Sequence, residues 1–247
     1  MYSVREKILA WGVHAYSMLG LIGAGIIGVC IVHGTPASFQ NAFWFMWLAT
    51  IVDATDGFLA RKARVKEVTP TFDGRRLDDL IDFINYTYLP LLLLWRAQIL
   101  PPDLTWLLLV PLLASSYGFC QSSAKTDDGY FLGFPSYWNL IAFYVYSFCP
   151  PVWLTLTVIL GFGFLTFIPS RYLYSTQPGL LNKITNVFAF CWAPYLMWLL
   201  FKVPAAEFIP GRVLETPLAT SYYLSLIFPV YYFSLSWAIT FKLWRKK

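Results

Sequence analysis

The sequence predicts an all-α integral membrane protein that folds as a single domain over residues 1–247 and crosses the bilayer about eight times. Hydrophobic residues make up 58% of the chain and charged residues only 13%, whereas soluble domains are about 45–50% apolar and about 25% charged. Long apolar runs recur along the whole sequence, and no polar half stands apart as a second domain. We therefore expect a polytopic membrane protein without a nucleic-acid partner.

Eight apolar segments are long enough to cross, or nearly cross, the hydrocarbon core of a bilayer. They cover residues 12–33, 39–60, 79–98, 104–123, 136–149, 151–168, 181–201 and 219–241. Prolines, glycines and charged residues fill the gaps, as expected of connecting loops. The fifth segment is short and is followed by Pro150 and Pro151, so an alternative is that it forms one broken element with the sixth, which would leave seven crossings.

The distribution of positive charge favours an even number of spans with both termini in the cytoplasm. With eight spans and a cytoplasmic N-terminus, all but three of the 18 Lys and Arg residues fall on the cytoplasmic side; the exceptions are Arg96, Lys202 and Arg212. Such an excess of Lys and Arg in cytoplasmic loops is a general feature of membrane proteins.

Four aspartates are spaced so that they would meet between two neighbouring spans. Asp53 and Asp56 are three residues apart near the cytoplasmic end of the second segment, and Asp78 and Asp82 are four apart at the start of the third. Residues at these spacings share one face of a helix, and consecutive elements are usually neighbours in space. We therefore expect the four carboxylates to converge at one level of the membrane.

Such a cluster points to divalent cations, because an uncompensated acid within a spanning helix costs about 2.5–3.5 kcal/mol on insertion scales. Mg²⁺ or Mn²⁺ prefers carboxylate oxygens and retains positions for water or a substrate phosphate. Two such ions would suit four acids and a diphosphate. The alternative is that the acids are solvated charges paired with nearby Lys and Arg, an interpretation we favour for Glu67, Asp73 and Asp79.

The pattern DxxDGxxAR over residues 53–61, followed by GxxxDxxxD over residues 74–82, resembles the signature of the CDP-alcohol phosphotransferase family. All eight fixed positions are present. The loop between Arg61 and Gly74 is longer than is common in that family. The resemblance implies an enzyme, and also a homodimer, that attacks a CDP-linked substrate at its diphosphate and expels CMP.

The resemblance also implies roles for the signature residues. Asp53 and Asp78 would bridge two metal ions, Asp56 and Asp82 would each complete one ion site, and Asp82 would be the catalytic base that takes the proton of the alcohol. The residues expected to contact the CDP moiety are Gly57, Ala60, Arg61 and Gly74.

A second stretch, AKTDDGYFLGFPSYWN (residues 124–139), extends the likeness. Together with the long acidic loop, it resembles bacterial members of the family that transfer a phosphatidyl group from CDP-diacylglycerol to choline at the cytoplasmic face of the inner membrane. A quaternary ammonium is recognised by aromatic faces, although an aromatic loop of purely structural value would look the same. The residues considered for choline contact are Asn85, Tyr86, Asp128, Tyr130, Tyr137 and Trp138.

Three other functions remain open on the sequence. A related phosphatidyltransferase would use inositol, serine or glycerol phosphate as its alcohol. An intramembrane prenyltransferase also binds a diphosphate through aspartates, but its acidic motifs would lie on well-separated helices. An ion-coupled transporter would line its path with acids in two matching halves, whereas the acidic cluster here occurs only between residues 53 and 82.

Overall fold

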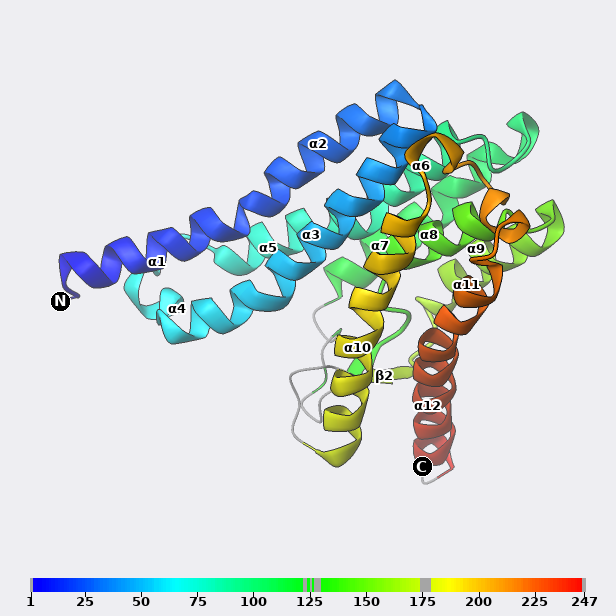
Figure 1. Ribbon diagram of the computed structural model, residues 1–247. Helices are drawn as coiled ribbons and strands as arrows, with labels where there is room; N and C mark the ends of the chain where they lie inside the picture. Colours follow the sequence, from blue (N-terminus) through cyan, green and yellow to red (C-terminus); the bar gives the residue numbers. More distant parts are fainter. Residues whose placement is uncertain (1, 122–123, 125, 127–129, 174–178, 246–247) are drawn as a thin grey trace.

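The computed structural model describes residues 2–121, 124, 126, 130–173 and 179–245, and nearly all of its regular structure is helical (Figure 1). The prediction of a helical fold is therefore confirmed. The helices are α1 (Val4–Ser17), α2 (Leu19–His33), α3 (Pro36–Lys62), α4 (Val65–Val68), α5 (Gly74–Asp82), the π-helix η1 (Phe83–Tyr88), α6 (Leu89–Arg96), η2 (Pro102–Leu108), α7 (Leu109–Cys120), α8 (Trp138–Phe148), α9 (Val152–Leu165), α10 (Leu180–Lys202), η3 (Ala205–Glu207), η4 (Arg212–Glu215), α11 (Ala219–Ser225) and α12 (Ile227–Trp244).

Helices α1 and α2 form one long rod with a break at Met18, and α3 returns antiparallel along it (Figure 1). The turn between α2 and α3 has clear local causes. Gly34 ends α2 with a left-handed backbone (φ 64°), and the Thr35 hydroxyl caps α3 by accepting from the Ser38 amide. Pro36 follows in the first turn of α3, where no intrahelical donor is needed.

Elements α5, η1 and α6 follow one another without a gap over residues 74–96; η1 contacts α3, and α6 packs on α2 and α8. The π-helical turn stands directly before the start of α6, where Pro90 has no amide to donate to the carbonyl four residues back. Wide π turns inside helices are frequent at functional sites. This turn lies immediately after Asp82, so it sets the direction of the side chains that follow that acid.

An aromatic core fixes the inner part of α3. Phe43 lies edge-on to Phe143 and Tyr146 of α8, with ring centroids 5.5 and 5.6 Å apart, and contacts Phe208 at 5.9 Å. All four side chains are buried. Edge-to-face pairs of this kind each add about 0.5–1.5 kcal/mol beyond the burial of their area. Phe43 lies about three turns of α3 before Asp53, so the core anchors the helix that carries this acid.

The all-α prediction is incomplete at one place. Strands β1 (Tyr130–Leu132) and β2 (Arg171–Leu173) pair antiparallel, with Phe131 opposite Tyr172. Three-residue strands are too short to leave a periodic pattern, and the pairing joins segments about forty residues apart, so no local pattern indicates it.

Four of the described helical segments are long and apolar enough to span a bilayer: Val4–His33, Pro102–Cys120, Leu180–Lys202 and Ala219–Trp244. Helix α9 is apolar but shorter. Large apolar side chains on these helices face outward, for example Val32, Phe190 and Phe201, which are 74%, 80% and 73% exposed. Such exposure indicates contact with lipid. The eight expected segments all contain helix, but the number of crossings and the side of each terminus stay predictions.

Gly133 follows β1 and lies against Thr166 at the end of α9. Its backbone conformation allows a prediction about stability. Its φ is 80°, and a Cβ there would overlap the carbonyl oxygen of Thr166. We expect Gly133→Ala to lower the free energy of unfolding by about 1–3 kcal/mol, because the backbone conformation is strained for alanine and the oxygen belongs to main chain. Thermal unfolding in detergent measures the change.

The control is Gly161→Ala within α9, where a Cβ would meet no atom within 4 Å. It should leave the midpoint unchanged or raise it slightly, since alanine is the better helix former. An unaltered midpoint in Gly133→Ala would contradict the prediction.

Candidate active site

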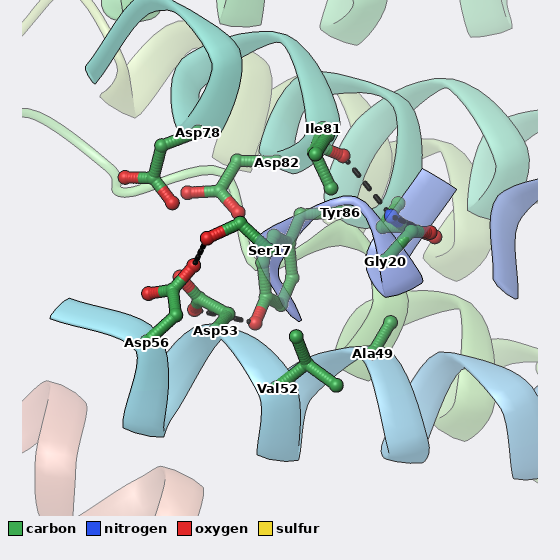
Figure 2. Close-up of a pocket in the computed structure, with 11 residues that line it drawn as sticks. Ser17, Gly20, Ala49, Val52, Asp53, Asp56, Asp78, Ile81, Asp82 and Tyr86 are labelled. Atoms are coloured by element: carbon green, nitrogen blue, oxygen red, sulfur yellow. Dashed lines mark hydrogen bonds between the residues drawn. The ribbon is translucent and has the colours of Figure 1, made fainter. Parts of the chain in front are cut away.

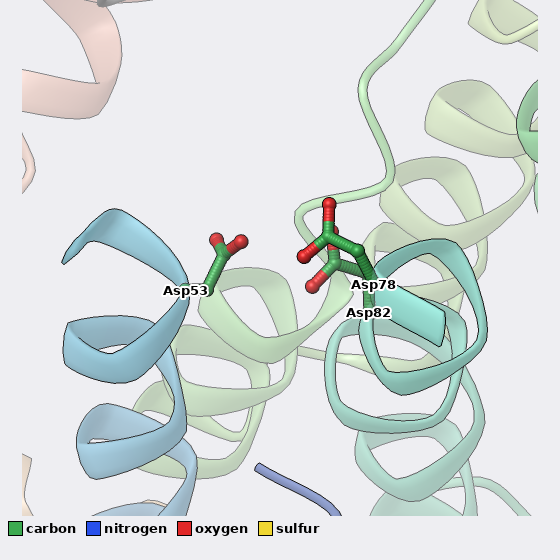
Figure 3. A group of neighbouring side chains, drawn as sticks. All are labelled: Asp53, Asp78 and Asp82. Carbon is green, nitrogen blue, oxygen red and sulfur yellow. The ribbon is translucent and has the colours of Figure 1, made fainter. Parts of the chain in front are cut away.

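Three of the four predicted acids lie together between α3 and α5. Asp53 projects from α3, and Asp78 and Asp82 project from α5 toward it (Figure 3). Each contributes one carboxylate oxygen to a group whose atoms all lie within 4.8 Å of one another. All three side chains are half-buried. The spacing of each pair on its own helix, together with the packing of α5 and η1 near α3, produces this meeting point.

Asp56 lies one turn beyond Asp53 on α3, outside that group of three but beside the same cavity. It is buried, and its Oδ2 accepts a hydrogen bond from Ser17 Oγ over 2.6 Å (Figure 2). Ser17 was not identified from the sequence. A polar residue in the apolar segment 12–33 was the available signal, but nothing in the sequence tied that position to Asp56.

The cavity between the acids is small. It measures about 10 Å³, close to the space needed by a single water molecule. Besides the four acids, it is lined by Ser17, Gly20, Ala49, Val52, Ile81, Asn85 and Tyr86 (Figure 2). Two unit charges at the 4.8 Å limit of the group repel by about 3 kcal/mol at an effective dielectric of about 20. The ionised acids therefore favour a cation among them.

The donor set fits a hard divalent cation. Three carboxylates from two helices supply only oxygen ligands, which is the chemistry that Mg²⁺ and Mn²⁺ prefer. The cavity has room for an ion or a water between these acids. Asp53, Asp78 and Asp82 are the residues that would bind the ion, and Asp56 is the acid nearest to them on α3.

Tyr86 and Asn85, both considered for choline contact, line this cavity. The Tyr86 hydroxyl donates to Asp53 Oδ2 over 2.8 Å. Asn85 Nδ2 donates to the carbonyls of Gly20 (3.0 Å) and Ile81 (3.1 Å). Asn85 Oδ1 is buried, and no described protein group donates to it. These two residues stand beside the acids, where an acceptor alcohol would have to approach.

Tyr130, Tyr137 and Trp138, also considered for choline contact, do not line the acid cavity. Trp138 is fully buried and donates from Nε1 to Ser115 Oγ over 2.7 Å. Tyr130 lies in β1, with the guanidinium of Arg171 5.5 Å from its ring centroid, and the Tyr137 hydroxyl is 3.4 Å from that of Tyr232. Asp128 falls outside the described residues.

The four positions expected to contact CDP have different surroundings. Gly57 is half-buried next to Asp56, and Arg61 Nη1 lies 3.5 Å from the point that a Cβ of Gly57 would occupy. The guanidinium therefore folds back along α3 in the direction of the acids. Ala60 packs instead on the small apolar cluster formed around Val65 and Val68.

Gly74 begins α5 and packs tightly on α1. A Cβ on Gly74 would lie 2.8 Å from Cε1 of His14, which is buried and hydrogen-bonded from Nε2 to Thr69 Oγ1 at 3.1 Å. His14 also packs on Phe72, with centroids 4.4 Å apart. A close approach of helices is thus a sufficient reason for glycine here, whatever the position contributes to nucleotide binding.

Comparison with known proteins agrees with the site. Residues 14–127 match the family model described as CDP-alcohol phosphatidyltransferase. The phosphatidylcholine synthase of Pseudomonas aeruginosa is 34% identical over 201 residues, which cover 81% of this chain and 83% of that protein. The chain belongs to the CDP-alcohol phosphatidyltransferase family.

Other relatives of this CDP-alcohol phosphatidyltransferase are also named phosphatidylcholine synthase. The phosphatidylcholine synthase of Legionella pneumophila is 35% identical over 192 residues, covering 75% of this chain and 71% of that protein. That of Borreliella burgdorferi is 34% identical over 184 residues, covering 72% and 75%. The family match includes all eight signature positions and also Ser17, which contacts Asp56 in the structure.

The contact between Gly74 and His14 generates a prediction about how α5 is positioned. Gly74→Ala should lower the free energy of unfolding by about 1–3 kcal/mol, because the added methyl group overpacks a buried contact. In a His14→Ala background the same substitution should cost at least about 1 kcal/mol less, since the opposing ring is gone. Thermal or denaturant unfolding of the four proteins measures this coupling. An equal loss of unfolding free energy in both backgrounds would show that the His14 ring does not limit the space at position 74.

Proposed function

We propose that this protein is a metal-dependent phosphatidyltransferase that condenses CDP-diacylglycerol with choline, giving phosphatidylcholine and CMP. The observation that carries the proposal is the group formed by Asp53, Asp78 and Asp82, whose oxygens lie within 4.8 Å of one another. The relatives named phosphatidylcholine synthase support choline as the acceptor. The alternative acceptors are inositol, serine and glycerol phosphate.

The acids of α3 and α5 would hold one ion, or two, of Mn²⁺ or Mg²⁺. When bound, a divalent cation neutralises charge on the diphosphate and orients it for displacement. Asp53 and Asp78 would each be a ligand of both ions, and Asp56 and Asp82 would each be a further ligand of one ion. Arg61, which lies along α3 beside Gly57, would pair with phosphate oxygens of the nucleotide, for which a planar guanidinium is well suited.

The transfer is a direct displacement at phosphorus. The hydroxyl oxygen of choline forms the new bond to the β-phosphorus, which carries the diacylglycerol, while the bond from that phosphorus to the bridging oxygen of CMP breaks. The proton of the hydroxyl passes to the Asp82 carboxylate, and CMP leaves with the bridging oxygen and its electron pair. A positioned base of this kind contributes about 10²–10⁴-fold to the rate. No protein nucleophile is required.

Residues beside the acids are the best placed to meet the alcohol. Asn85 and Tyr86 line the cavity three and four positions after Asp82. Aromatic faces attract a quaternary ammonium, and the ring of Tyr86 is the aromatic surface in that lining. Tyr130, Tyr137 and Trp138 are not part of that lining, so we give Asn85 and Tyr86 priority over them.

We propose that the protein lies in the bacterial inner membrane, with eight crossings, both termini in the cytoplasm and the acids at the cytoplasmic side. The bias of Lys and Arg supports this orientation. Acyl chains would then stay in the bilayer, the CDP headgroup would reach the acids from the surface, and choline would arrive from the cytoplasm. A homodimer is proposed from the family resemblance.

The substrate assignment is tested by following CMP release from CDP-diacylglycerol by the purified protein. With Mn²⁺ present, CMP should appear when choline is added, with matching formation of phosphatidylcholine, and EDTA should abolish it. Inositol, serine and glycerol phosphate are tested in parallel. CMP release with one of these and not with choline would refute the choline assignment while leaving the displacement chemistry in place.

Asp82→Asn tests the role of the base. Turnover should fall by at least about 10²-fold, because the amide cannot take the proton, while binding of CDP-diacylglycerol persists in part. The matched control is Asp79→Asn, on the same helix, whose carboxylate pairs with Arg75 at 3.9 Å rather than joining the acid group. That variant should turn over at close to the normal rate. Undiminished turnover in Asp82→Asn would end this mechanism.

A further inference from the structure

Two hydroxyl groups donate hydrogen bonds to the two carboxylates of α3. Ser17 Oγ donates to Asp56 Oδ2 over 2.6 Å, and the Tyr86 hydroxyl donates to Asp53 Oδ2 over 2.8 Å. The donors belong to different elements, since Ser17 is the last residue of α1 and Tyr86 lies in η1 (Figure 2). Each of these acids is therefore bonded at one oxygen by the side chain of another element.

Ser17 lies between two contacts that fix α1 and α2 against α5 and the loop before it. Three residues earlier, His14 is buried and hydrogen-bonded to Thr69. Three residues later, the carbonyl of Gly20 accepts from Asn85. A Cβ on Gly20 would lie 2.7 Å from a methyl group of Ile81, so the helices approach as closely as they do only because this residue is glycine.

Tyr86 is fixed by the π-helical turn that follows Asp82. The two residues are four positions apart, and both line the cavity. One continuous stretch of chain therefore supplies Asp82 as a ligand candidate and Tyr86 as the donor to the facing Asp53. The Tyr86 hydroxyl uses its single proton in that bond, and this leaves its ring rather than its proton for any alcohol in the cavity.

A hydroxyl bonded to one oxygen restricts the rotation of a carboxylate. Groups that orient metal ligands in this way typically change metal affinity 10–100-fold when they are removed. We propose that Ser17 and Tyr86 are positioning residues that fix Asp56 and Asp53 in the orientation needed for a divalent cation. The proposal rests on the metal dependence of the proposed function, but not on which alcohol is the acceptor.

The test measures Mn²⁺ binding to the purified full-length protein in detergent, without CDP-diacylglycerol, by isothermal titration calorimetry. Ser17→Ala and Tyr86→Phe should each weaken binding by about 10–100-fold, because each removes a hydroxyl that orients a ligand. Ser17→Thr keeps a hydroxyl and should retain most of the affinity. Tyr88→Phe removes an exposed hydroxyl from the same π-helical element and should bind Mn²⁺ like the unmodified protein.

The outcomes separate the proposal from its rivals. Normal Mn²⁺ affinity in both Ser17→Ala and Tyr86→Phe would overturn it, and so would a Tyr86→Phe variant in which only the KM for choline rises. If Ser17→Ala does not fold, Tyr86→Phe decides the question by itself, and normal Mn²⁺ affinity in that variant would then overturn the proposal. Absence of Mn²⁺ binding in the unmodified protein would instead remove the metal dependence on which both proposals rest. Failure of choline alone to support CMP release would leave this inference intact.

Discussion

The architecture depends on holding like charges together inside a membrane protein. Asp53 of α3 has a carboxylate oxygen within 4.8 Å of those of Asp78 and Asp82 of α5. Two unit charges at that distance repel by about 3 kcal/mol at an effective dielectric of about 20, so α3 and α5 would move apart if they were free. The helices are not free. Phe43 ties α3 to the aromatic core, and His14, Gly20 and Asn85 tie α5 and η1 to the rod of α1 and α2. This packing therefore holds the three acids in position for a cation.

The first two helices are more than a membrane anchor. The break at Met18 directly follows Ser17, whose hydroxyl contacts Asp56. Small residues permit the approach, since Gly20 and Gly74 each stand where a side chain would collide with α5 or with α1. Close contact through glycines is a common means of packing membrane helices. Here it also brings a hydroxyl to an acid, so helix packing and the chemistry of the site share the same residues.

The aromatic residues between positions 130 and 139 also have structural roles. Trp138 fills the core and donates to Ser115, and Tyr130 pairs with β2 through the backbone. Gly133 passes under the Thr166 carbonyl in a backbone conformation that suits glycine. The packing of α8 and α9 is therefore a sufficient reason for these residues, whatever they contribute to recognition of an alcohol. The acid cavity, with Tyr86 and Asn85 in its lining, is the part of the structure where substrate chemistry is concentrated.

The sequence by itself determined the helical membrane class, the apolar segments and the two pairs of acids, because composition and helical spacing are local properties. The eight signature positions also placed the chain in its family before any contact was known. Only the tertiary structure decided that Asp56 bonds to Ser17, that Tyr86 bonds to Asp53, that Gly74 packs on His14 and that two three-residue strands pair. Each of these joins residues that are distant in the chain, and their meeting depends on how whole helices pack, which no local pattern encodes.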